Sequence, residues 1–163
     1  MKTIKLADYT VKTDTNQTFG IELTENVLAA DMISYVVVYS DLSDDSAWCD
    51  SHFETFKSAE DADKAIQDFI DQHHATVIDG LGIMVLDAQS RTTETGVKHE
   101  FALRRSVSAW RSGFLDVSYE VVHSWGETDD DEICQSNHGH HVYEHDDLGH
   151  ARYSFDYYTK EEH

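Results

Sequence analysis

The chain has 163 residues and a formal net charge of −20 at pH 7, because 32 acidic residues outnumber 12 lysines and arginines. A hydrophobic fraction of 40% predicts one folded domain spanning residues 1–163 and excludes a disordered acidic tail. The sequence has neither an apolar membrane span nor the apolar segment of a signal peptide, so we expect a cytoplasmic protein with no membrane partner.

Strands are predicted first along the chain. Residues 18–24 alternate weakly, residues 34–40 are β-branched and aromatic, and residues 81–86 form another apolar run. The clearest helix lies between the second and third of these strands, at 58–73. We therefore consider a β-α-β arrangement of the strands at 34–40 and 81–86.

The 58–73 helix is predicted to be amphipathic. Ser58 is placed to cap it, with Asp61 three residues on in the position of a capping box. Its apolar residues recur at helical spacing and predict a buried stripe of Ala62, Ala65, Ile66, Phe69 and Ile70. At 100° per residue the acidic residues on the opposite side fall within a band about 100° wide, formed by Glu60, Asp61, Asp68 and Asp71.

The second half of the chain favours a strand meander. Residues 97–103 and 115–121 alternate and predict a long hairpin with its turn at 111–113, and residues 151–157 repeat the alternation. The segment at about 126–149 is polar, acidic and rich in histidine, and we expect an irregular excursion there. No internal repeat is visible. The predicted fold is α+β, with a mostly antiparallel sheet and one main amphipathic helix packed on it.

The acidic residues are concentrated in two blocks. Residues 41–71 carry a net charge of −8 and residues 116–163 a net charge of −11, whereas residues 72–115 carry +1 and include four of the five arginines. Each contact with a nucleic-acid phosphate needs a cation, so this balance argues against direct nucleic-acid binding. It favours instead a partner whose own surface is cationic.

The leading hypothesis is therefore an acidic inhibitor that occludes a nucleic-acid-binding or nucleic-acid-processing protein, with an anti-restriction, anti-CRISPR or nuclease-immunity role. The mechanism would be DNA mimicry without catalysis, and no catalytic motif such as a Gly-x-Ser-x-Gly elbow or a phosphate-binding glycine loop is present. The residues predicted to bind the partner are Glu60, Asp61, Asp68, Asp71, Asp129, Asp130, Asp131, Glu132, Asp146 and Asp147.

A second hypothesis is a metal site in the histidine-rich segment. His138-x-His140 followed by Glu144 resembles the first half of the metal-binding motif of cupins, which implies a metal-dependent enzyme with zinc or another divalent transition metal. The resemblance covers seven residues, and the glycine and proline pattern of the second cupin motif is absent. Another possible zinc set pairs Cys49-x-x-His52 with Cys134-x-x-x-His138; otherwise we expect free thiols in a reducing compartment.

A third hypothesis explains the charge by habitat. Proteins adapted to high salt carry surface acid and little lysine, and this chain has 20 Asp, 12 Glu and 7 Lys. A halophilic housekeeping domain would then unfold at low salt, because its carboxylates would repel one another without screening.

Overall fold

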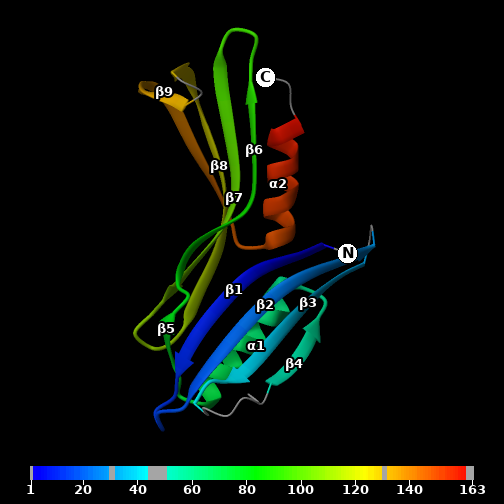
Figure 1. Cartoon of the computed structure of the whole chain (residues 1–163), viewed down its shortest axis with the longest axis vertical. Helices are drawn as coiled ribbons and strands as arrows, with labels where there is room; N and C mark the ends of the chain where they lie inside the picture. The colour runs from blue at the N-terminus through cyan, green and yellow to red at the C-terminus, as the bar shows by residue number, and fades with distance from the viewer. Residues whose placement is uncertain (1, 30–31, 44–50, 130–131, 161–163) are drawn as a thin grey trace. The chain divides into compact units, whose positions relative to one another are not determined.

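The computed structural model describes residues 2–29, 32–43, 51–129 and 132–160 (Figure 1). Within these residues the chain forms two antiparallel sheets and two helices, which confirms the α+β prediction. The chain divides into two compact units: unit 1 comprises residues 1–82 and 107–116, and unit 2 comprises residues 83–106 and 117–163.

Unit 1 contains a five-stranded antiparallel sheet in the order β4-β3-β2-β1-β5. Its strands are β1 (Lys2–Lys12), β2 (Thr18–Ala29), β3 (Met32–Asp41), β4 (Ser51–Phe56) and β5 (Thr76–Asp79). The strands predicted at 18–24 and 34–40 are confirmed as parts of β2 and β3. Strands β1 to β4 follow one another as neighbours, and β5 returns to pair with β1 at the opposite edge.

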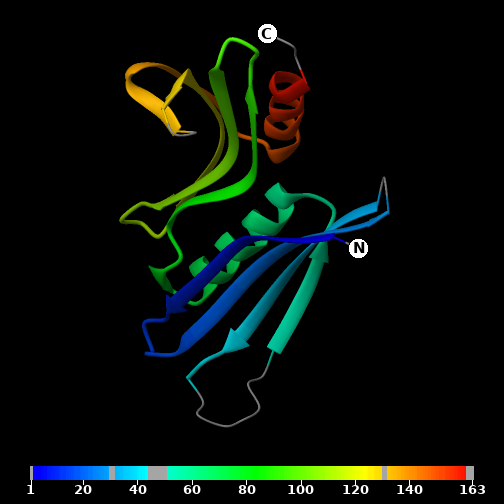
Figure 2. The ribbon, with the colours of Figure 1, turned by 45° about the horizontal axis from the view of Figure 1, so that its top comes forward.

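Helix α1 (Ala59–Gln72) covers one face of this sheet, as Figure 2 shows. The Ser58 side chain caps it as predicted, accepting a hydrogen bond from the Asp61 backbone N–H at 3.1 Å. The helix needs this cap because its first N–H groups have no partner within the helix. The helix packs on β2, β3 and β4. Its buried residues are Ala59, Ala62, Ile66 and Ile70.

The turn between β7 (Val97–Ala109) and β8 (Leu115–Asp129) also belongs to unit 1, where it is held by the side chain of Gln67 on α1. Gln67 Oε1 accepts from the Leu115 backbone N–H at 2.7 Å, and Gln67 Nε2 donates to the Gly113 carbonyl at 3.2 Å. One amide thus satisfies a backbone donor and a backbone acceptor that lie more than forty residues away in the sequence.

Unit 2 contains a four-stranded sheet in the order β6-β7-β8-β9, followed by a helix. Strand β6 is Gly82–Thr92, β9 is Glu132–His145, and helix α2 is Leu148–Lys160. The predicted long hairpin is confirmed as β7 and β8, with the turn closed by a hydrogen bond from Gly113 N to the Trp110 carbonyl at 2.9 Å.

Three expectations from the sequence are wrong. Residues 126–149 do not form an irregular excursion in their described part, since they contain the end of β8 and all of β9. Residues 151–157 lie in α2 and not in a strand, because Leu148, Ala151 and Phe155 are buried at helical spacing. The strands at 34–40 and 81–86 lie in different sheets, so no β-α-β unit forms.

The two units repeat one order of elements, four antiparallel strands followed by a helix, although the sequence shows no repeat. The turn joining the first two strands has the same hydrogen bonds in each unit. In unit 1, Thr13 donates from its backbone N to the Gln17 carbonyl (2.9 Å) and accepts from Gln17 N at Oγ1 (3.1 Å). In unit 2, Thr93 makes the same two bonds with Val97, at 2.8 and 3.1 Å.

Candidate functional site

The predicted acidic band on α1 is largely exposed. Asp61, Asp68 and Asp71 are exposed and Glu60 is half-buried, and we call these four residues the α1 acidic face. The ion pairs of the described residues do not include Asp61, Asp68 or Asp71. Their charge is therefore available to solvent or to a partner.

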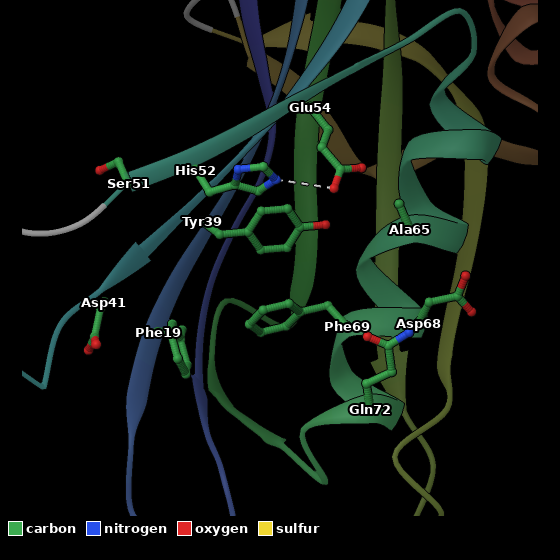
Figure 3. A pocket seen from close by; sticks show the side chains of 10 residues that line it. All are labelled: Phe19, Tyr39, Asp41, Ser51, His52, Glu54, Ala65, Asp68, Phe69 and Gln72. Carbon is green, nitrogen blue, oxygen red and sulfur yellow. Dashed lines mark hydrogen bonds and ion pairs between the residues drawn. The ribbon is translucent and has the colours of Figure 1, made fainter.

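A cavity of about 500 Å³ lies in unit 1 between α1 and the strands β2, β3 and β4 (Figure 3). We call it the α1 cavity. Its acidic lining residues come from three elements: Asp41 ends β3, Glu54 lies in β4, and Asp68 lies on α1. Asp68 thus belongs both to the α1 acidic face and to the cavity wall. No lysine or arginine is among the described residues that line the cavity.

Aromatic rings make up the apolar part of the cavity wall. Tyr39 stacks between two of them, with its centroid 4.7 Å from Phe69 and 6.2 Å from His52. Phe19 meets Phe69 edge to face at 5.3 Å. The rings come from β2, β3, β4 and α1, and the pairing of Ile21 with Tyr39 in the β2–β3 register brings the first two strands into place.

The potential inside the α1 cavity is negative. Burial, with the smaller effects of the Glu54 and Asp68 carboxylates, raises the pKa of the Tyr39 phenol to about 12. Both carboxylates act in this direction because a phenolate would add a third negative charge beside them. The His52 ring nitrogen Nε2 lies 3.3 Å from Glu54 Oε1, which orients that carboxylate at the cavity rim.

Unit 2 carries different side chains at the equivalent place. Phe19 lies six residues after Thr13, and His99 lies six residues after Thr93, so the two occupy equivalent positions. In unit 2, His99 Nδ1 lies 2.9 Å from His123 Nε2, and Tyr143 on β9 stacks on Tyr158 of α2 at 4.4 Å. This region is rich in histidine and tyrosine where unit 1 is rich in carboxylates.

The described acidic residues predicted to bind a partner in the second half of the chain lie at the two ends of β9, with Asp129 and Glu132 at its start and Asp146 and Asp147 after its end. Asp147 Oδ1 accepts from the His150 backbone N–H at 2.9 Å and so caps α2, which gives it a structural role. Asp146 beside it is exposed. Asp130 and Asp131 lie outside the described residues, and Asp129 and Glu132 are described by their backbone alone, as a pair in the β8–β9 register.

The two predicted metal-ligand sets lie only partly within the described residues. His140 and Glu144 are four residues apart on β9, so their Cα atoms are separated by about 13 Å, too far to share one ion. His140 Nδ1 lies instead 3.0 Å from Ser124 Oγ. No group of three metal-ligating side chains gathers among the residues that the structure describes. Cys49 and the side chains of Cys134 and His138 lie outside them.

The sequence indicated the acidic face of α1 but not the α1 cavity. Phe19, Tyr39 and Glu54 lie on three different strands, and only the sheet register places them around one space. The available signal was the half-buried edge of the helix: Ala65 and Phe69 belong to the predicted apolar stripe, yet both are only partly buried and both line the cavity.

Comparisons with models of protein families, with curated proteins and with solved structures found no match to this chain. Neither described helix is long and apolar enough to cross a membrane. Function must therefore be inferred from the chemistry of the residues themselves.

Proposed function

We propose that the chain is an acidic binding protein that occludes a cationic nucleic-acid-binding or nucleic-acid-processing protein and performs no chemistry of its own. The observation that supports this proposal is the α1 acidic face, in a chain with a net charge of −20. The role corresponds to that of DNA mimics that inhibit restriction or CRISPR enzymes and of immunity proteins that block nuclease toxins.

The number of carboxylates along α1 is closer to the number of phosphates along one nucleic-acid strand than to the number along a duplex. The helix carries five carboxylates and one lysine in 14 residues, which span about 21 Å. Over that length a single strand presents about 6 phosphates and a duplex about 12. We therefore propose that α1 follows the track of one strand across the partner's cationic surface.

The test is competition for DNA binding. Purified restriction endonucleases, CRISPR effectors and nuclease toxins are assayed for DNA binding with and without the chain, over a range of salt concentrations. The expected result is loss of DNA binding by at least one enzyme, with an effect that weakens steeply as salt rises. If no enzyme of these classes is inhibited, the proposed function is wrong.

A pair of charge-reversal variants locates the binding surface. Asp61→Lys with Asp71→Lys should weaken inhibition about tenfold at about 50 mM salt, because two attractions become repulsions. The matched control, Asp14→Lys with Glu94→Lys, changes the net charge equally at two exposed hairpin turns. Equal loss in both variants would assign the effect to bulk charge and contradict a role for α1. Reversal of Asp129 to Asp131 tests the second acidic segment in the same assay.

A further inference from the structure

The α1 cavity has the size of a specific binding site. Its volume of about 500 Å³ lies within the range of roughly 300–1,000 Å³ that is typical of ligand pockets. Three acidic residues, Asp41, Glu54 and Asp68, line this space from β3, β4 and α1. Figure 3 shows the Glu54 carboxylate between the Tyr39 hydroxyl and α1, whereas the Asp68 carboxylate points away from the rings. With no lysine or arginine among its described lining residues, the cavity repels anions and attracts cations.

The aromatic rings of the cavity favour an organic cation that carries an apolar chain. Phe19, Tyr39 and Phe69 give the cavity wall apolar surface. Because the Tyr39 ring stacks on Phe69 and on His52, these rings serve to pack the alkyl stem of a cation, and the carboxylates supply the attraction for its charge. A neutral apolar ligand would remove the Glu54 and Asp68 carboxylates from water and supply no compensating charge, which is costly. An alkyl chain ending in a cation satisfies both parts of the wall, since its stem packs on the rings and its head meets the carboxylates.

We propose that the α1 cavity binds the ammonium or guanidinium group of a lysine or arginine side chain that projects from the cationic partner. This inference rests on the proposed function and deepens it, because it identifies one residue of the partner that would anchor it to the acidic surface. Asp68 belongs to both the α1 acidic face and the α1 cavity, since it is exposed on α1 and also lines the cavity. Cationic anchors in pockets carry a large share of the binding energy at protein interfaces.

Because the two units repeat one order of elements, the residues that line the α1 cavity can be compared with those at the equivalent positions of unit 2. Counting from the helix caps Ser58 and Asp147, the position of Glu54 in unit 1 is that of Tyr143 in unit 2. By the same count, Asp68 corresponds to Tyr157. The positions of Glu54 and Asp68 are thus occupied by phenols in unit 2, so we expect cations to bind more tightly in unit 1 than in unit 2.

The experiment titrates the full chain with N-acetyl-lysine amide, N-acetyl-arginine amide and N-acetyl-norleucine amide, followed by nuclear magnetic resonance. The two cations should shift the resonances of Glu54, Phe69 and Gln72, and the uncharged norleucine compound should not. Glu54→Gln with Asp68→Asn should weaken cation binding about tenfold. The matched control, Asp14→Asn with Glu94→Gln, removes the same charge elsewhere and should bind as the unmodified chain does. The spectra also report whether each variant is folded.

Three outcomes would overturn the inference: binding of norleucine as tightly as lysine, equal weakening in both double variants, or shifts confined to other residues. Spermidine separates a free organic cation from a partner side chain. Saturating spermidine should displace the partner; if it fills the cavity and leaves partner binding unchanged, the site is one for a small molecule. Failure of this inference can be told apart from failure of the proposed function. Asp61 and Asp71 lie outside the α1 cavity, and the effect of reversing their charges is measured on the partner.

Discussion

Tyr39 is the residue at which the core of unit 1 meets the α1 cavity. Its side chain is 7% exposed in β3, and its hydroxyl points toward α1 (Figure 3). The β-branched and aromatic residues at 34–40 predicted the strand that carries Tyr39. They could not predict the Glu54 and Asp68 carboxylates near the hydroxyl, because these lie on β4 and α1 and arrive there only through tertiary packing.

The first prediction concerns alkaline pH. The pKa of Tyr39 is raised from 10.0 to about 12, so between these values the unfolded chain loses a proton that the folded chain retains. The contribution is complete below about pH 10 and is lost as pH rises toward about 12, with a total of about 2–3 kcal/mol in the free energy of unfolding. Tyr39→Phe should remove this part of the decline. Urea denaturation of both proteins from about pH 9 to about pH 12 measures it. Parallel declines would contradict the prediction.

At the scale of elements, the helices show what a single sequence can and cannot indicate. Helix α1 was predicted because its cap and its spacing agree. Helix α2 was missed because Ala151 and Phe155, four residues apart, fit both a strand of period 2 and a helix. The exposure of Tyr153, at 75%, and the cap at Asp147 decide for the helix. Strand β9 was missed because it is a polar edge strand held by backbone pairing with β8.

The second prediction tests the helix caps. Ser58→Ala and Asp147→Ala should each lower the free energy of unfolding by about 1 kcal/mol, because each removes the acceptor of one N-terminal N–H group. Urea denaturation measures the loss. Ser112→Ala, at an exposed serine in the β7–β8 turn, is the control and should change stability little. A cap variant that loses no more than this control would show that its hydrogen bond does not stabilise the helix. Ser58→Asp should restore the cap.

At the scale of the whole molecule, the net charge of −20 should govern stability in solution. The block of acid at 41–71 is visible in the sequence, and its display on α1 follows from helical spacing. The repeat of the two units was not visible, because equivalent positions carry unlike residues: Phe19 corresponds to His99, and Ile66 corresponds to Phe155. The shared order of elements reveals it, together with the hydrogen bonds of Thr13 and Thr93 in the matched turns.

The third prediction is a dependence of stability on salt. Raising sodium chloride from about 10 mM to about 1 M shortens the screening length from about 30 Å to about 3 Å and weakens the repulsion among the carboxylates. The midpoint of thermal unfolding should therefore rise with salt. A chain that is unfolded at the lowest salt would favour the halophile hypothesis, and a midpoint that does not rise would show that self-repulsion is unimportant. Circular dichroism during heating measures the midpoint.

The matched threonine turns have a consequence for how fast each unit forms. Because the turns at 13–17 and 93–97 are short and closed by their own hydrogen bonds, the first hairpin of each sheet costs little loop entropy. Later strands then add next to their neighbours in sequence, which favours rapid folding. Strand β5 is the exception, since it pairs with β1 across more than sixty residues and must await α1. We therefore expect closure of that edge to be a late step in the folding of unit 1.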